Sequence, residues 1–358
     1  MIKIRIFKDI DNLNLKKDWN YLFNKLNFNN QNNYLYSFLN YEIVKIWFDI
    51  YDPSKTLINI ISIYKNDKPI IIIPLIKYNF LFLSIYKIMG GLEFDYKNIL
   101  VDYDEMYFDK ILIYQKIRSI FGANYFFIID GMNDKYTYRF FKGLFKYKFF
   151  IKKDVSSFFI PNNGIIPKKL KKRIAKFKLA NKVSYQKIMK KDKNFDLVMR
   201  KLFFLKNEQY KKSNSSLMPF KRKKFYLDLA KTNISHLSCT LIGNDLAAIH
   251  LGLLSKNNFV YLLPAYDNAF YKDSPGWIHI DYLLSECLNL KINKFDLTIG
   301  NEGYKKRIST NTNNIYTLIG SDFFSIFNLY IVRFYYYLKD LSLFKDLKFF
   351  IRSFIRIL

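Results

Sequence analysis

The residues best suited to acid–base chemistry lie in one short run, "KFDLTIGNEGYK", which spans residues 294–305. Its two carboxylates, Asp296 and Glu302, are candidate general bases, because a carboxylate can accept a proton from a nucleophile. Tyr304 and Lys305 are candidate proton donors or phosphate contacts. For Asp296 a structural role is the alternative, since an acid in an apolar strand often hydrogen-bonds to a neighbouring turn.

A second run, "DSPGWIHIDYLL" (273–284), predicts a helix whose start can bind an anion. Apolar residues recur with helical spacing from Ile280 to Leu288, directly after Ser274, Pro275 and Gly276. The first N–H groups of a helix have no intrahelical partners and lie at the positive end of the helix dipole, so they suit a phosphate. The alternative is that Ser274 simply caps the helix.

Cysteine and histidine are too few for a metal centre or a disulfide framework. The chain has two cysteines and three histidines, with no zinc-ligand spacing, no Ser-His-Asp arrangement and no nucleotide-binding loop. We therefore expect no metal, and a reducing, cytoplasmic setting. We expect His250 to be a hydrogen-bonded histidine of the core or of a cleft wall.

Composition predicts a globular protein with anionic partners. Half of the 358 residues are hydrophobic, and the formal net charge is +28. Such a charge favours nucleic acid, anionic lipid or phosphate-bearing substrates, although a Lys- and Asn-rich composition is also typical of AT-rich genomes. The start, "MIKIRIFKDI", lacks the apolar region of a secretory signal, and no apolar run reaches the ~18 residues of a membrane span. We expect a soluble protein, at most in peripheral contact with an anionic membrane.

The second half of the chain predicts three antiparallel strands, a helix and a parallel strand. The strands are expected at 236–242, 246–254, 259–266 and 294–300, and the helix at 276–290. Pro264 either ends the third strand or marks the place where the strand parts from its neighbour. The first half repeats this order, with strands at 57–64, 70–78, 82–89 and 124–130 and a helix at 104–121. The first-half helix opens with Asp102, Asp104 and Glu105, which would cap it and repel a phosphate.

A basic stretch joins the two halves. Residues 155–191 contain eleven Lys or Arg and no acid, and Pro167 suits the start of a helix there. Lys172 and Arg173 are candidate phosphate contacts, although a solvated helix face is the alternative. Further helices are expected at 194–210 and 219–231, and a basic, aromatic helical tail at the end of the chain. The expected divisions are 1–154, 155–192 (basic linker helix), 193–318 and 319–358.

Three runs of the second half carry a family resemblance: "IGNDLAAIHLGLL", "YLLPAYDNAFYKDSPGWIHIDYLL" and "KFDLTIGNEGYKKRIS". They resemble the GNAT acyltransferase superfamily, and within it the CelD-like acetyltransferases associated with polysaccharide biosynthesis, which are related to the Fem-type aminoacyltransferases. The resemblance implies an α/β (α+β) fold of two tandem GNAT-like halves. Each half would be a mixed, mainly antiparallel sheet flanked by helices, with the acceptor on the first half and the donor on the second.

The resemblance also implies site residues and an activity. It places the donor against Ala265, Tyr266, Ser274, Pro275, Gly276, Trp277 and Lys305, with Asp296, Glu302 and Tyr304 as catalytic residues. The implied activity is N-acyl transfer, most simply N-acetyl transfer, from acetyl-CoA or another acyl-CoA to an amine on a sugar or cell-envelope precursor.

Two alternatives stay open. The glycine-rich phosphate loop of ordinary GNAT enzymes is reduced to Gly276, so an aminoacyl-tRNA donor is a second possibility. The alternative function is that of a non-catalytic basic protein that binds nucleic acid or an anionic membrane.

Overall fold

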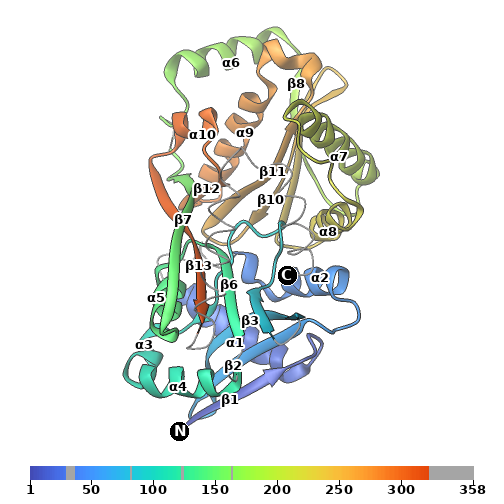
Figure 1. Ribbon diagram of the computed structural model, residues 1–358. Helices are drawn as coiled ribbons and strands as arrows, with labels where there is room; N and C mark the ends of the chain where they lie inside the picture. The colour runs from blue at the N-terminus through green and yellow to red at the C-terminus, as the bar shows by residue number, and fades with distance from the viewer. Residues whose placement is uncertain (30–36, 81–82, 122–124, 163, 322–358) are drawn as a thin grey trace, which may run out of the picture. The chain divides into compact units, whose positions relative to one another are not determined.

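The computed structural model describes residues 1–29, 37–80, 83–121, 125–162 and 164–321. The chain divides into two compact units, Met1–Asp154 with Asn314–Leu358, and Val155–Asn313. Helices accompany the sheet of each unit (Figure 1). The tail expected at 319–358 lies outside the described residues, except for Ile319–Ser321, which belong to a strand.

The first unit is organised on a mixed sheet. Its elements are β1 (Ile2–Phe7), α1 (Leu13–Asn29), α2 (Tyr41–Tyr51), β2 (Ile58–Lys65), β3 (Lys68–Phe80), β4 (Leu83–Ile88), β5 (Leu100–Val101), α3 (Tyr103–Met106), η2 (Tyr107–Asp109), α4 (Lys110–Phe121), β6 (Tyr125–Met132), α5 (Lys135–Leu144), the start of β7 (Tyr147–Phe159) and most of β13 (Asn311–Ser321). The strand order is β1-β2-β3-β4-β6-β13, with β5 beside β3. Only the β4–β6 contact is parallel among these pairs.

The second unit is organised in the same way. Its elements are the end of β7, α6 (Lys168–Ala180), β8 (Val183–Ile188), α7 (Phe195–Lys212), α8 (Phe220–Ala230), β9 (Ser235–Ile242), β10 (Asp245–Leu254), β11 (Asn258–Tyr266), η3 (Asn268–Asp273), α9 (Pro275–Asn289), β12 (Lys294–Ile299), α10 (Gly303–Ile308) and the start of β13. The strand order is β8-β9-β10-β11-β12-β7, and only β11–β12 is parallel. Residues 155–192, expected as a linker, supply α6 and β8 of this unit.

The two strand orders correspond position by position, which confirms the duplicated α/β architecture predicted from the sequence. In each unit three antiparallel strands lead through a helix into a parallel fourth strand. The sixth strand is exchanged. β7 begins in the first unit and pairs with β12 of the second, whereas β13 begins in the second unit and pairs with β6 of the first.

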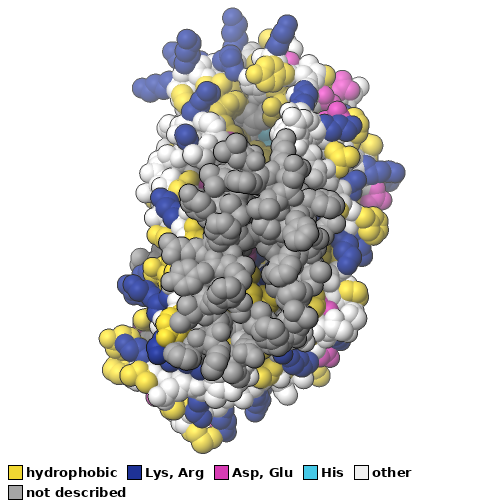
Figure 2. All heavy atoms as spheres, in the orientation of Figure 1, with side chains coloured by type: hydrophobic (Ala, Val, Ile, Leu, Met, Phe, Trp, Pro, Cys, Tyr) yellow, Lys and Arg dark blue, Asp and Glu magenta, His cyan; other side chains and the backbone are white. Residues whose placement is uncertain are grey.

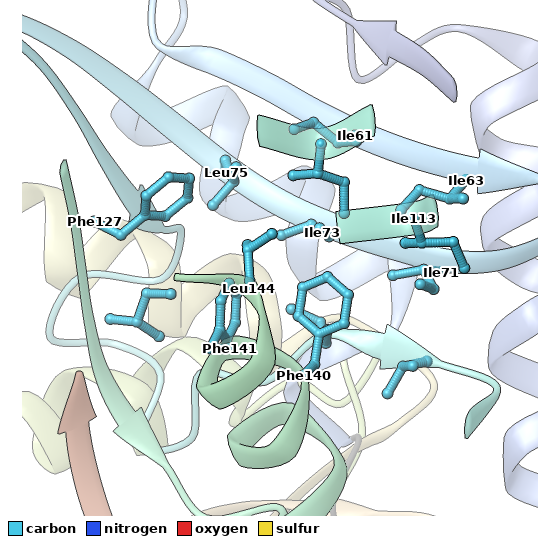
Figure 3. Packing of buried hydrophobic residues seen from close by; sticks show 14 of the residues in the cluster. Ile61, Ile63, Ile71, Ile73, Leu75, Ile113, Phe127, Phe140, Phe141 and Leu144 are labelled. Atoms are coloured by element: carbon cyan, nitrogen blue, oxygen red, sulfur yellow. The ribbon is translucent and has the colours of Figure 1, made fainter. Parts of the chain in front are cut away.

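The core of the first unit lies between its sheet and the helices α4 and α5. Figure 3 shows side chains of β2 and β3 facing Ile113 of α4 and Phe140, Phe141 and Leu144 of α5. β3 alternates Ile71, Ile73 and Leu75 toward this cluster, as period-two strand geometry requires. Burial of such apolar side chains, at ~25 cal/mol per Å², is the main driving force for this packing.

The core of the second unit lies between β11, β12 and β7 and the helices α6, α9 and α10. α9 contributes Ile278, Ile280, Leu283, Leu284 and Cys287, and these have the helical spacing expected from the sequence. Because this face is buried, the start of α9 is held in a fixed place relative to the strands beside it.

Candidate functional site

The parallel strands β11 and β12 pair only near their beginnings. The last paired residues are Val260 and Asp296, after which β11 runs on to Tyr266 and β12 to Ile299 with no further pairing between these described strands. β12 turns instead toward β7, with a register shift between Asp296 and Ile299 and a left-handed backbone at Thr298 (φ 64°). The edge of β11 that follows Val260 therefore carries backbone groups without a strand partner on the β12 side.

Pro264 neither ends β11 nor marks the first parting of the strands. β11 continues through it, paired with His250 of β10. Its carbonyl accepts a hydrogen bond from Nζ of Lys206 in α7 at 3.0 Å. The parting begins at Tyr261, before Pro264 is reached.

Asp296 is fully buried, and it forms a hydrogen bond and an ion pair with residues of its own strand. Its Oδ1 accepts from the Thr298 amide at 2.8 Å, and its Oδ2 lies 3.0 Å from Nζ of Lys294. Burial lowers the pKa of Lys294, and the nearby carboxylate opposes that shift. These contacts hold the shifted register of β12 and favour the structural role for Asp296.

The loop after β12 brings three predicted residues together at the start of α10. Lys305 is buried, and its Nζ donates to the Ile299 carbonyl at 2.6 Å and lies 3.0 Å from Oε2 of Glu302. The Glu302 side chain is 55% exposed, so its carboxylate is accessible to solvent. Burial, with Tyr261 and Glu302 nearby, raises the pKa of Tyr304, so its phenol stays protonated at neutral pH.

Two residues that sequence reasoning did not assign to the site lie where β11 leaves β12. Tyr261 stacks on the imidazole of His250, with ring centroids 4.4 Å apart. The described residues supply no hydrogen bond to its hydroxyl, and burial raises its pKa. The alternation of 259–265 already puts Tyr261 on the face of Phe259, and a hydroxyl on such an apolar face is the signal that could have found it.

His250 corrects the expectation of a hydrogen-bonded histidine. It is completely buried, and neither ring nitrogen has a hydrogen-bond partner in the described part of the chain. Burial lowers its pKa well below the ordinary value, and His279, His236 and Lys206 lower it further. The ring fits only because position 252 is glycine: a Cβ there would lie 2.4 Å from His250 Cε1 and from the Val260 carbonyl oxygen.

The other two histidines continue this buried polar cluster beneath α9. His279 bonds to the hydroxyls of Thr240 (2.9 Å) and Ser238 (3.2 Å), and burial together with His236 lowers its pKa to about 3. His236 lies 3.0 Å from Glu286. Burial raises the pKa of Glu286, but hydrogen bonds from His236 and Tyr185 outweigh it and bring the value to about 2. The cluster therefore contains neutral His279 beside an ionised Glu286.

No side chain of the described residues caps the start of α9. Ser274 precedes the helix in a left-handed conformation (φ 56°), and its carbonyl accepts from the amides of Trp277 and Ile278. Pro275 has no N–H. In this turn, only the amide of Gly276 has no acceptor among the described residues. The helix start therefore offers fewer N–H groups to a ligand than the sequence suggested. By contrast, Asp102 caps α3 through the Glu105 amide, as expected.

Helix α6 lies beside the start of α9. Arg173 donates to Oγ of Ser274 at 2.6 Å, and Lys178 forms a 2.7 Å ion pair with Asp281 of α9. Lys172 is exposed on the same helix. Figure 2 shows the basic side chains gathered at the top of the view, over α6. A cationic surface thus adjoins the uncapped helix start.

Three further residues were predicted to contact the acyl donor: Ala265, Tyr266 and Trp277. Tyr266 ends β11, and its Cδ1 would lie 3.7 Å from a Cβ at Gly276. Trp277 packs on the same core cluster as Tyr304, and Ala265 is buried in β11. The structure therefore groups Arg173, Ser274, Gly276 and Tyr266 at one place, and Glu302, Tyr304 and Lys305 at the other end of the open β11 edge.

The described part of the chain contains neither a cluster of metal-binding side chains nor a helix that could span a membrane. There, no three His, Cys, Asp or Glu side chains are grouped so as to hold a metal ion. No described helix combines the length and the apolar character that crossing a membrane requires.

One family model matches a large part of the second unit. Residues 168–306 match the family model described as "Acetyltransferase (GNAT) domain". This range runs from the start of α6 into α10 and so contains both groups of site residues. A comparison with curated protein sequences gave no match.

Solved structures share the fold at low sequence identity. A conserved protein of unknown function from Bacteroides thetaiotaomicron VPI-5482 is 11% identical, with a TM-score of 0.54 over 90% of this chain and 100% of its own. FemX is 9% identical, with a TM-score of 0.55 over 76% of this chain and 90% of its own. L-PGS from Bacillus licheniformis is 9% identical, with a TM-score of 0.52 over 87% and 94%.

Proposed function

We propose that this protein transfers an acyl group from an acyl-CoA to an amine. The premise is that residues 168–306 form an acyltransferase domain of the GNAT superfamily. The acceptor we propose is a sugar or cell-envelope precursor, in keeping with a fold shared with FemX and L-PGS. Both cysteines are free and buried, which fits a reducing, cytoplasmic setting.

The observation that carries the proposal is the uncapped start of α9. The Gly276 amide and the helix dipole favour a negative charge there. Arg173, held by Ser274, and the exposed Lys172 add positive charge. A donor diphosphate placed at this point would extend its thioester along the edge of β11 toward Tyr261 and Tyr304.

The proposed reaction uses the open edge of β11 and the loop before α10. The acceptor amine attacks the thioester carbonyl, and a main-chain N–H of residues 261–265 stabilises the oxyanion. When the C–S bond breaks, Tyr304 is the proton donor to the sulfur, and Glu302 receives the amine proton. Each of the two carboxylates has a lysine partner, but Glu302 is better placed than Asp296, because its side chain is 55% exposed whereas that of Asp296 is buried.

Gly276→Glu tests the donor site. In a calorimetric titration with acetyl-CoA and longer acyl-CoAs, we expect this substitution to weaken binding by about tenfold or more, because a carboxylate replaces the favourable field at the helix start. Gly276→Ala is the matched control, since its Cβ meets Tyr266 at an ordinary 3.7 Å and adds no charge.

Two results would count against the proposal. Wild-type protein that binds no acyl-CoA would remove the proposed donor, and binding of an aminoacyl-tRNA in its place would keep acyl transfer with another donor. Equal affinity of the Glu and Ala variants would move the phosphates away from α9.

A further inference from the structure

The segment 209–224, "QYKKSNSSLMPFKRKK", combines strong positive charge with exposed apolar side chains. It holds six Lys or Arg and no acid, and it covers the end of α7, the connecting loop and the first turn of α8. Within it, Phe220 is 79% exposed and Leu217 is 51% exposed. Large apolar side chains at such exposure, rimmed by charge, are typical of interaction sites.

The loop is held in place by its own contacts, so the exposure of these side chains is a feature of the fold. Ser215 donates its amide to the Tyr210 carbonyl at 2.8 Å. The Met218 side chain is buried, and its amide bonds to Oδ1 of Asn207 at 3.0 Å. Met218 therefore anchors the loop on α7, and Leu217 and Phe220 stand on either side of that anchor.

We propose that this segment docks the protein on an anionic lipid bilayer. Phe220 and Leu217 enter the interface between headgroups and acyl chains, and the lysines around them meet lipid phosphates. Lys212 and Lys221 are exposed beside the two apolar residues. Figure 2 shows hydrophobic and basic side chains next to one another along the edge over α7 and α8.

Charge and side-chain type select the bilayer among possible occupants. A nucleic acid would satisfy the lysines but would gain nothing from an aliphatic side chain such as Leu217. A second copy docked symmetrically would bring two acid-free basic segments together, and like charges repel. An anionic bilayer satisfies both the cations and the apolar side chains.

The test is sedimentation of the full chain with vesicles of phosphatidylcholine alone or mixed with phosphatidylglycerol. We expect binding to the anionic vesicles only, weakening with added salt. Leu217→Ser with Phe220→Ser, and separately Lys212→Glu with Lys221→Glu, should each lower the partition coefficient by about tenfold or more. The matched control is Lys176→Glu with Leu179→Ser, which alters an exposed basic and apolar pair on α6 and should bind like wild type.

Several results would overturn the docking surface. Equal binding to both vesicle types would remove the role of charge, and loop variants that bind like wild type would place docking elsewhere. Stronger binding to single-stranded RNA, lost in the charge variant but kept in the apolar one, would assign the segment to nucleic acid. Self-association of wild type that Phe220→Ser abolishes would assign it to a second copy. Acyl-CoA titration of the same variants separates this proposal from the proposed function, because the substitutions lie outside the α9 start.

Discussion

The side chain of Ser274 does not cap α9, although the residue occupies the N-cap position. A left-handed backbone is costly for a residue other than glycine, by roughly 1–2 kcal/mol. At Ser274 the conformation (φ 56°) is accompanied by the hydrogen bond from Arg173. Because its hydroxyl accepts from Arg173 instead of from the helix, the Gly276 amide stays open. No sequence pattern pairs residues 101 positions apart, so this contact could not be predicted.

His250 makes stability depend on pH. Its folded-state pKa lies well below the 6.5 of an unfolded histidine, so below that pH the unfolded chain binds a proton that the folded chain does not. Stability from this group is complete above pH 6.5 and is lost as the pH falls, by about 1.4 kcal/mol per pH unit until the folded pKa is reached. His250→Phe keeps an aromatic ring on Tyr261 and removes this dependence.

Urea unfolding between about pH 7.5 and about pH 5 measures the effect, and the wild-type curve should be steeper than that of His250→Phe by one proton. Above pH 6.5 the two curves should run parallel, which serves as the internal control. The groups facing His250 (His236, His279 and Lys206) are present in both proteins. Parallel curves over the whole range would show that folding does not lower the pKa of His250.

At the scale of elements, the sequence predicts the helices and strands of the two repeated orders, but not β1, α1, α2, α5, β7 or β8. The helix expected at 276–290 is observed as Pro275–Asn289, and the strand expected at 246–254 as Asp245–Leu254. β13 has no such signal in its first residues, "NTNN", because none of them has an apolar side chain. The sequence offers a parting of β11 from its neighbour at Pro264 as one alternative, but the observed start at Tyr261 could not be predicted, because no pattern indicates the left-handed Thr298 of β12.

The bulge of β10 opposite β11 gives a prediction at this scale. The register of the pair shifts between Leu251 and Leu253, and Gly252 lies at the shift. Gly252→Ala should destabilise the protein by about 2 kcal/mol or more, because its Cβ would meet backbone at Val260 and the His250 ring, both at 2.4 Å. Gly303→Ala is the control: nothing lies within 4 Å of its Cβ, and alanine suits a helix. Denaturant unfolding of both variants decides the point, and equal stabilities would contradict it.

For the whole molecule, the net charge of +28 is a source of self-repulsion. Many acids already have partners, for example Asp228 with Lys224 and Lys231. Because basic residues outnumber acids, the remaining lysines repel one another. The net charge follows from the composition alone. Only the fold shows that part of the positive charge lies on α6 and on the segment 209–224.

Added sodium chloride should therefore raise the melting temperature. We expect a rise of a few degrees between about 0.01 M and about 0.3 M salt, as screening shortens the range of repulsion. Differential scanning fluorimetry measures it, with sucrose at equal osmolality as the uncharged control. A melting temperature that falls with salt would mean that ion pairs outweigh repulsion.

The exchange of β7 and β13 has a consequence for synthesis on the ribosome. β6 is translated early, but its neighbour β13 emerges only after the whole of Val155–Asn313 has been made. Until then, the edge of β6 in the nascent first unit has no β13 to pair with, and a strand of another chain can pair with it instead. The second unit is therefore synthesised before the sheet of the first unit is complete, and a chaperone that covers the β6 edge would protect the chain during this interval.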